Sequence, residues 1–373
     1  MADPGPYRIL SIDGGGIRGL IPARIVAYLE AQAGEPVSKL FDMIAGTSTG
    51  GLLALGFSHP DAQGQASFSG EDAVALYRDK GRRIFDERFF RSKWLQPKYP
   101  ADGLNDALAE VFGDTMLAQA LTGVLVTTYA MDVPAPSTPD AEPKPRPFFF
   151  KSWRAEHGDP AAGEQPADRN FRMRDAARAT SAAPTYFAPA EIVSESGRRY
   201  LCCDGGVFAN NPAMCALASS RELTAGQPEA QRREIYVVSL GTGKREQVIS
   251  EDNMLGWGRL GWFPDVLDVM FDGVADTVTY QIDREVRRHH RFQTNLTPYD
   301  DGYPVQAFDD ASQENTAALI RKADELIEEQ RAELDRIARE LKGWAGQPPT
   351  AGPGGGAAGD GRDDEADEGP PIA

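Results

Sequence analysis

Ser48 lies in a glycine-rich turn whose spacing suits a nucleophile. Gly46 and Gly50 flank it in a GxSxG pattern, after an apolar run and before a helical pattern. A serine at such a sharp turn has strained backbone angles, and only small neighbours let the strand and the helix approach closely around it. The N-terminus of the following helix favours the negative charge of a developing alkoxide or oxyanion. The pattern therefore predicts a nucleophile, with a plain tight turn as the alternative.

Asp204 is a candidate base for that serine. It ends the apolar run 200–203 and is followed by Gly205 and Gly206. At the carboxyl end of a strand, its carboxylate would reach across the ends of neighbouring parallel strands, where open α/β sheets hold their sites. A free aspartate is a weak base with a pKa of about 3.9, so this role needs burial that raises the pKa and a hydrogen bond to the serine. Taken alone, the pattern is better explained as a structural turn.

Histidine is a stronger base near neutral pH, and the chain has His59, His157, His289 and His290. A helix after Ser48 would place His59 about 16 Å away, out of reach, and His157 lies in a polar segment. The pair at 289–290 follows Asp204, so the Ser–Asp–His order of an α/β-hydrolase esterase is available. That fold has several strands before its nucleophile, whereas only one clear strand precedes the strand of Ser48 here. The histidine triad is thus the alternative mechanism, and the segment 287–291 fits a charged surface better.

A second glycine-rich turn, DGGGIRG at 13–19, matches GxGxxG through Gly14, Gly16 and Gly19. A dinucleotide site also needs an acidic residue at the end of the next strand, and that strand ends in AGTS at 45–48. Neither turn is followed by the Lys and Ser or Thr of a phosphate-binding loop. The two turns therefore do not predict a nucleotide cofactor.

Strand-like apolar runs alternate with helical patterns along most of the chain. The runs lie at 7–12, 41–45, 124–129, 148–151, 200–203 and 235–240. This alternation predicts an α/β fold with three layers (α/β/α), in which helices cover both faces of a mainly parallel sheet. We expect one domain over residues 1–345, with an irregular, proline-rich excursion at 133–170.

The end of the chain changes in character. Residues 311–344 are predicted as one long helix in which apolar residues recur every seven positions, at Ile320, Ile327, Leu334 and Leu341. This stripe suits packing on the core, and a homo-oligomer formed through the helix is the alternative. Residues 346–373 consist mostly of Gly, Pro, Ala and acidic residues, which predicts a disordered tail.

Charge and composition exclude several classes of protein. The 373 residues include 39 Lys and Arg against 56 Asp and Glu, a net charge of −17, so a nucleic-acid polymer is not an expected partner. Three clustered cysteines form neither a disulfide framework nor a CxxC metal motif. No run approaches the roughly 18 apolar residues of a membrane span, and the N-terminus lacks the pattern of a secretory signal. We expect a cytoplasmic protein.

Taken together, the motifs resemble those of the patatin-like phospholipases. The similarity covers most of the chain in the order DGGGIRG at 13–19, GTSTG at 46–50, TSAAPTYF at 180–187, DGGVFANNP at 204–212 and SLGTG at 239–243. The combination is far more specific than any single motif.

The resemblance implies a lipid acyl hydrolase that cleaves fatty acyl esters of phospholipids or related lipids. Ser48 would be the nucleophile and Asp204 the base, without a histidine, a metal or a cofactor. The amides of Gly14, Gly15 and Gly16 would form the oxyanion hole. Arg18 would support that loop, Pro184 would turn the chain near the site, and Asn210 and Asn211 would brace the loop after the base.

Three further expectations concern partners. The segment 255–264 carries Trp257 and Trp262 and leads into a helix with Val266, Met270 and Val274 on one side; we expect that side to face the core, with peripheral membrane contact as the alternative. A cyclic-nucleotide-activated phospholipase of bacterial anti-phage defence is a variant of the same function, in which Arg284, Arg287, Arg288 and Arg291 would hold the nucleotide. A solvated basic face explains these arginines better, because no nucleotide-binding motif accompanies them. A non-enzymatic interaction or storage protein is the last alternative.

Overall fold

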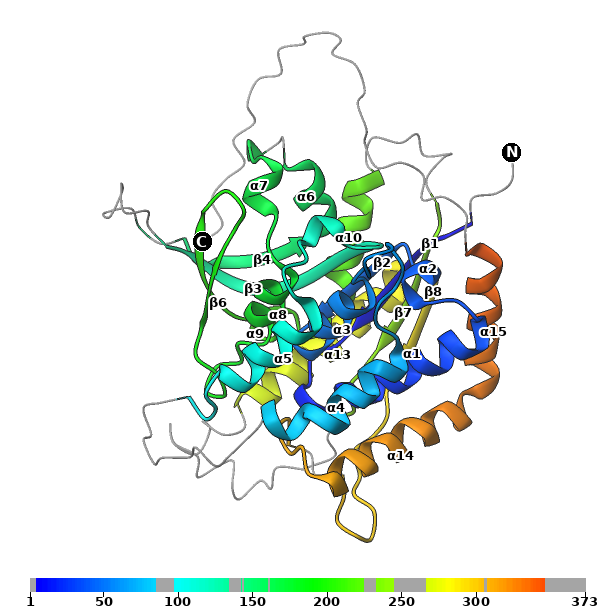
Figure 1. The fold of residues 1–373 in the computed structure, drawn as a ribbon. Coiled ribbons are helices and arrows are strands. Elements are labelled where there is room, and N and C mark those ends of the chain that lie inside the picture. The colour runs from blue at the N-terminus through cyan, green and yellow to red at the C-terminus, as the bar shows by residue number, and fades with distance from the viewer. Residues whose placement is uncertain are drawn as a thin grey trace.

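A mainly parallel sheet forms the centre of the protein (Figure 1). The computed structural model describes residues 5–84, 97–133, 142, 144–159, 162–224, 233–244, 266–304 and 307–345. The strands are β1 (Tyr7–Ile12), β2 (Met43–Thr47), β3 (Gly123–Asp132), β4 (Arg146–Lys151), β5 (Ala190–Val193), β6 (Arg199–Asp204), β7 (Ile235–Leu240) and β8 (Arg288–Phe292). Their order is β5-β6-β3-β2-β1-β7-β8, with β4 also paired to β3. The pairs among β3, β2, β1, β7 and β8 are parallel, whereas β4, β5 and β6 pair antiparallel.

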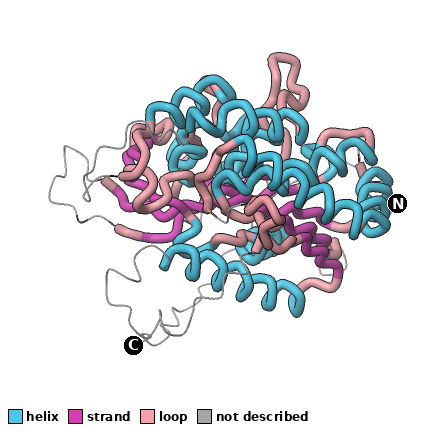
Figure 2. The backbone as a smooth tube through the Cα atoms, turned by 90° about the horizontal axis from the view of Figure 1, so that it is seen from below, coloured by secondary structure: helices cyan, strands magenta, loops and turns pink. Residues whose placement is uncertain are grey.

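Helices cover both faces of the sheet (Figure 2). One layer contains α1 (Leu20–Ala33), α3 (Thr49–Phe57), α4 (Gly70–Ile84), α5 (Asp102–Phe112), α8 (Met173–Thr180), α14 (Gln313–Glu329) and α15 (Arg331–Trp344). The other contains α9 (Gly206–Ala209), α10 (Ala213–Thr224) and α13 (Val266–Glu285). Short helices α2 (Val37–Leu40), α6 (Ser152–His157) and α7 (Pro166–Arg169) complete the described set, with the 3-10 turns η1 (Gly16–Gly19) and η3 (Leu117–Gln119). The predicted three-layer α/β fold is confirmed.

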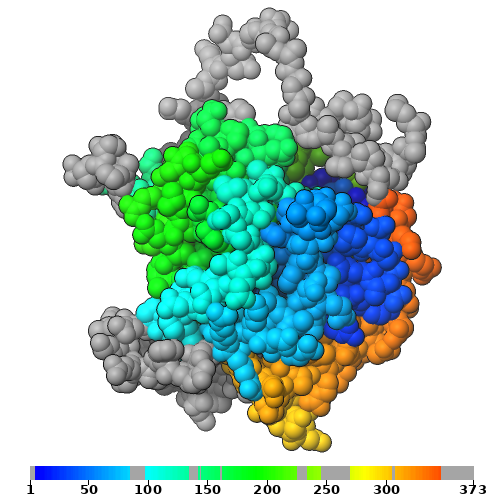
Figure 3. All heavy atoms as spheres, viewed as in Figure 1, coloured from blue at the N-terminus to red at the C-terminus, as the bar shows by residue number. Residues whose placement is uncertain are grey.

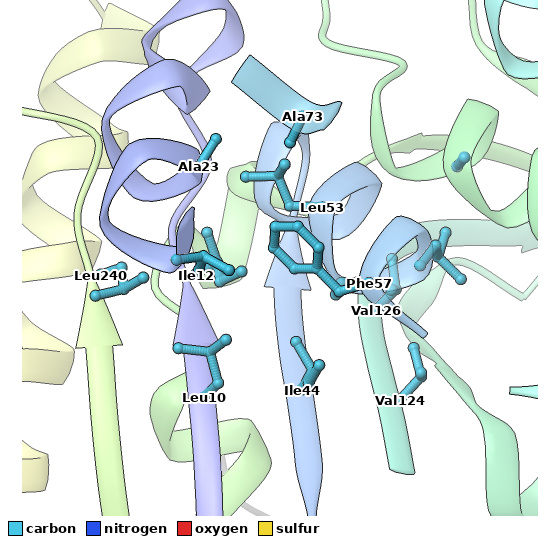
Figure 4. Close-up of a cluster of buried hydrophobic side chains, with 14 of the residues drawn as sticks. Leu10, Ile12, Ala23, Ile44, Leu53, Phe57, Ala73, Val124, Val126 and Leu240 are labelled. Atoms are coloured by element: carbon cyan, nitrogen blue, oxygen red, sulfur yellow. The ribbon is translucent and has the colours of Figure 1, made fainter. Parts of the chain in front are cut away.

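The core lies on both sides of the sheet because successive side chains of a strand point to opposite faces. Leu10 and Ile12 of β1 and Ile44 of β2 point toward the layer of α1 and α3 (Figure 4). Ile9 of β1 and Met43 of β2 pack on the opposite face, against α10 and α13. Strands buried on both faces explain the continuous apolar runs of the sequence.

All six predicted strands are present, and two others were missed. β5 has only four residues, and β8 has the sequence RHHRF, in which only Phe292 is buried. The sequence indicates 287–291 as a charged surface segment; Arg287 is exposed and residues 288–291 are half-buried, but the latter also belong to an edge strand that was not predicted. Edge strands often carry charged side chains. The predicted irregular excursion at 133–170 contains β4, α6 and α7, although residues 134–141, 143 and 160–161 lie outside the described part.

The predicted single helix over 311–344 is two helices, and the chain bends at Gln330 (φ −112°). The bend keeps both helices in contact with α1. Arg24 of α1 donates a hydrogen bond to Asp324 of α14 (2.8 Å), and Tyr28 of α1 donates one to Asp335 of α15 (2.6 Å). An unbroken helix of that length would extend about 50 Å and could not stay in contact with the shorter α1 along its whole length. Figure 3 shows these C-terminal helices (orange) beside the N-terminal residues (blue).

The heptad stripe of this segment faces the chain's own core, since Ile327, Leu334 and Leu341 are buried there. The expected packing of this stripe on the core is therefore confirmed, whereas the alternative of a homo-oligomer through 311–344 stays a prediction. Among the described helices, none combines the length and apolarity that crossing a bilayer requires. The domain boundary at 345 stays a prediction, and the tail 346–373 lies outside the described residues.

Candidate active site

Ser48 stands between β2 and α3 with a strained backbone (φ 54°, ψ −124°). Its N–H donates to Thr180 Oγ1 (2.8 Å) at the end of α8, and its carbonyl accepts the first bond of α3. A Cβ at Gly46 would lie 2.0 Å from the Gly50 carbonyl oxygen, and one at Gly50 would lie 2.2 Å from that of Ile12. Only glycine fits at either position. The predicted strained turn is confirmed.

The sheet register brings Asp204 to this turn. Thr47 pairs with Thr127 of β3, and the next β3 residue, Thr128, pairs with Asp204 at the end of β6. β6 runs antiparallel to β3, so the expected approach across the ends of parallel strands is wrong in direction. Asp204 nevertheless lies at the edge of the sheet where β2 ends, because its partner Thr128 directly follows the partner of Thr47 on β3.

The Asp204 carboxyl group is fully buried. Its Oδ1 accepts the Gly206 N–H (2.7 Å), whereas Oδ2 accepts no hydrogen bond of ordinary length and angle from a described residue. Burial raises the pKa of Asp204 to about 7, against the lowering influence of the Ser48 side chain and the Gly206 amide. Burial with a raised pKa is one of the two conditions that the sequence-based role of a base requires, the other being a hydrogen bond to the serine.

The raised pKa of Asp204 predicts a pH profile. If Asp204 must be ionised to accept a proton, kcat/KM for an ester should rise with pH through about 7 and level off above it. Steady-state rates between pH 5 and 9, with an uncharged ester, measure this limb. A limb near pH 4, the range of an ordinary aspartate, would contradict the assignment of Asp204 as a buried base.

The glycine turn 13–19 lies beside Ser48, but its three amides are not equivalent. The Gly14 N–H already donates to the Asn210 carbonyl (3.0 Å), so the expectation that all three serve an oxyanion hole is wrong for Gly14. The amides of Gly15 and Gly16 donate to no residue in the described part of the chain, and both glycines line the pocket of Ser48. Thr242 Oγ1 donates to the Gly14 carbonyl (2.7 Å), which fixes the peptide plane that carries the Gly15 N–H.

An ion pair between half-buried Arg291 and the buried Asp13 carboxylate anchors this turn to the edge of the sheet. Arg291 of β8 donates two hydrogen bonds to the Asp13 carboxylate (3.0 and 2.5 Å) and one to Ser239 Oγ (2.9 Å). Sequence reasoning missed this role of Arg291, because no local pattern links the two residues. Arg18 is buried rather than exposed, and its Nε donates to the Gly15 carbonyl (3.4 Å), in line with the support expected of it.

Breaking this pair should destabilise the fold. Arg291→Met leaves the buried Asp13 carboxylate without its partner, which typically costs roughly 3 kcal/mol or more of the free energy of unfolding. Urea unfolding of the wild type and the variant measures the difference. Arg288→Met is the matched control on the same strand, because Arg288 forms a more exposed pair with Glu340 and should cost less than about 1 kcal/mol. Equal losses in the two variants would contradict a special role for Arg291.

An apolar pocket lies over Ser48 and Asp204, and both residues form part of its lining. Besides the two polar residues, its walls include Leu52, Ile84, Leu104, Tyr186, Phe187, Phe271 and Phe308. Tyr186 belongs to a turn that starts at the half-buried Pro184, and Phe187 follows it, so the predicted turn near the site is present. The pocket suits a long apolar ligand whose polar bond lies at Ser48.

No histidine lines this pocket, and all four lie in the described part of the chain. His289 Nδ1 contacts Asp283 (2.6 Å), His290 Nδ1 contacts Glu333 (2.9 Å), and His59 contacts Ser67 and Thr115. The residues of the alternative triad are therefore not brought together.

Two other groupings considered from the sequence look different in the structure. Arg288 pairs with Glu340 and Arg291 with Asp13, on opposite faces of β8, so these two arginines do not share one cluster, and activation by a cyclic nucleotide stays a prediction. In α13 the buried residues include Phe271, which forms a wall of the pocket, whereas Met270 is 41% exposed, contrary to prediction. Trp257 and Trp262 lie outside the described residues.

A serine at a strained strand-to-helix turn and a buried aspartate, on a mainly parallel sheet covered on both faces, define this as an α/β protein with an enzyme-like site. The model of the patatin-like phospholipase family matches residues 10–217, which include Ser48 and Asp204. The chain belongs to the patatin-like phospholipase family.

Similar proteins of known sequence cover most of the chain. Patatin-like protein 2 of Arabidopsis thaliana is 31% identical over 354 residues, covering 86% of this chain and 82% of the relative. The potato (Solanum tuberosum) protein named probable inactive patatin-3-Kuras 1 is 28% identical over 89% of each chain. Among solved structures, human GIVD cytosolic phospholipase A2 aligns with 92% of this chain and 61% of its own, at 10% identity and a TM-score of 0.40.

Proposed function

We propose that this protein is a lipid acyl hydrolase that cleaves fatty acyl esters of phospholipids or related lipids. The observation that carries the proposal is the buried Asp204 carboxylate beside Ser48, in the wall of an apolar pocket. Membership of the patatin-like phospholipase family supports the lipid substrate. We further propose that it acts from the cytoplasm at the membrane surface, in keeping with three cysteines that are unpaired thiols.

The proposed reaction has two halves. Ser48 Oγ attacks the ester carbonyl carbon while its proton passes to Asp204. The carbonyl oxygen becomes an oxyanion that accepts hydrogen bonds from the N–H groups of Gly15 and Gly16. The C–O bond to the lipid alcohol then breaks, and the alcohol takes the proton from Asp204. In the second half, Asp204 takes a proton from water, which attacks the acyl-enzyme. The fatty acid leaves as Ser48 recovers its proton.

The energetics of the site fit these steps. A base whose pKa lies near the working pH both accepts and returns a proton with little penalty, which an ordinary aspartate does not. One oxyanion donor typically contributes about 3 kcal/mol to transition-state stabilisation. The apolar walls exclude water when an acyl chain fills the pocket, and this strengthens both interactions.

Hydrolysis assays test the proposal directly. The wild-type protein should release fatty acid from phospholipid vesicles and from a fluorogenic medium-chain ester in the presence of a chelator. A fluorophosphonate should label the peptide that contains Ser48, as mass spectrometry can show. Absence of both hydrolysis and labelling would refute the proposal and favour a binding or storage protein.

The double variant His289→Asn/His290→Asn separates the two mechanisms. A Ser–Asp dyad predicts turnover within about threefold of the wild type, because neither imidazole lines the pocket. Loss of turnover without loss of thermal stability would restore the histidine triad.

A further experiment applies if the fluorophosphonate labels Ser48 of the wild type but the protein does not hydrolyse vesicles. Calorimetric titration with cyclic dinucleotides then tests whether the phospholipase needs such an activator.

A further inference from the structure

We propose that Phe308 is a positioning residue that couples the wall of the acyl pocket to the peptide carrying the Gly16 N–H. The inference rests on the proposed function, in which that N–H stabilises the oxyanion. Phe308 lies between β8 and α14, and none of the sequence motifs includes it. Its contacts reach the glycine turn from two directions, through the backbone and through the ring.

The backbone of Phe308 lies directly against the turn. Its carbonyl accepts the Ile17 N–H (2.8 Å), immediately after the two glycines whose amides lack a described acceptor. Gly16 has φ +57°, and a Cβ there would lie 2.1 Å from the same Phe308 carbonyl oxygen. The Phe308 backbone therefore packs directly on the turn, holds it through one hydrogen bond and leaves no room for a side chain at residue 16.

The ring of Phe308 acts through Arg18. The guanidinium carbon of Arg18 lies 3.9 Å from the ring centroid, and both side chains are buried. Arg18 Nε in turn donates to the Gly15 carbonyl (3.4 Å). A buried cation on an aromatic face gains roughly 2 kcal/mol, so the ring restricts where the guanidinium can lie.

The contact of Arg18 with the Gly15 carbonyl affects the proposed oxyanion donor directly. The carbonyl belongs to the same planar, trans peptide as the Gly16 N–H, so the two groups point in opposite directions. By holding the carbonyl, Arg18 directs the N–H away from itself. The aromatic ring, the guanidinium and the peptide plane thus form one chain of contacts that ends at the donor.

The other side of the Phe308 ring belongs to the pocket. It lies 5.9 Å from the ring of Phe271 in an edge-on arrangement, and both rings line the pocket with Ser48. An acyl chain bound there would press on the ring that fixes the Gly16 peptide. Substrate packing and donor alignment therefore depend on one side chain.

The test compares Phe308→Leu with Phe308→Tyr, which keeps a ring over Arg18, and with Leu104→Ala, a matched truncation of the same pocket wall on α5. Rates on the medium-chain ester are expressed per Ser48 titrated with fluorophosphonate, at a temperature where thermal melts show every variant folded. We expect Phe308→Leu to lower kcat roughly 10- to 100-fold because the donor is misaligned, and to raise KM no more than Leu104→Ala does, because leucine keeps an apolar wall. Phe308→Tyr should stay within about threefold, and Leu104→Ala should raise KM while kcat is kept.

A double variant tests whether the ring works through Arg18. Arg18→Lys combined with Phe308→Leu should lower kcat no further than the stronger single change, because both break one chain of contacts. A rise in KM alone for Phe308→Leu, or multiplicative losses in the double variant, would overturn the inference. If Phe308→Leu fails to fold, Arg18→Lys alone must show the same loss of kcat. A wild type that hydrolyses no ester refutes the proposed function itself, and this is seen before any variant is compared.

Discussion

Replacing Ser48 by alanine should lower kcat for ester hydrolysis by about 10⁴-fold or more, because the acyl-enzyme can no longer form. The strained turn should survive, since the N–H of residue 48 still donates to Thr180 and the glycines around it are unchanged. The fluorogenic ester measures the rate, and fluorophosphonate labelling should disappear in parallel. Vesicle binding should remain, because the apolar pocket is intact.

Ser58→Ala is the matched control for this change. Ser58 caps the other end of α3, is fully buried, and has a hydroxyl group without a hydrogen-bond partner among the described residues. The same chemical substitution on the same helix should leave the rate within about threefold of the wild type, since surrounding structure and site are unchanged. Residual turnover in Ser48→Ala at the wild-type level would mean that another group is the nucleophile.

Asp204→Asn should lower kcat by about 10²- to 10⁴-fold, because the amide cannot accept the serine proton. It should also stabilise the protein above neutral pH. The native pKa of about 7 lies above the ordinary value of 3.8, so the native state holds a proton that the unfolded state has lost within this window. The stability contributed by this group therefore falls as pH rises from about 4 to 7, and the uncharged amide avoids that loss.

Thermal melts of wild type and Asp204→Asn at pH 5 and pH 8 measure this effect. The variant should gain more over the wild type at pH 8 than at pH 5. Asp132→Asn, at the end of the neighbouring strand β3, is a control for which the opposite change in thermal stability is expected. Although burial acts against it, hydrogen bonds from Arg146 and Arg198 hold the pKa of Asp132 below its usual value. Removing that charge should destabilise the protein at pH 8, and a stabilised Asp132→Asn would count against this account.

The sequence by itself determined the features that depend on neighbours along the chain. Six strands and the turn around Ser48 were predicted, because an apolar run followed by small residues dictates both. The local pattern at Asp204 favoured a structural turn, and only the resemblance of the combined motifs to a family implied that it is the base, a role with which its burial is consistent. The edge strand β8 was missed because its charged residues lack an apolar alternation.

Only the tertiary structure decided which groups complete the site. Asp13 and Arg291 are 278 residues apart in sequence, and no periodicity signals that they pair. Tertiary contacts likewise assign the Gly14 amide to Asn210 and leave the amides of Gly15 and Gly16, two residues that line the pocket, without a described acceptor. They also break the C-terminal helix at Gln330 so that both halves follow α1. Local patterns fix where a backbone turns, whereas the partner of a buried polar group depends on which distant segments pack beside it.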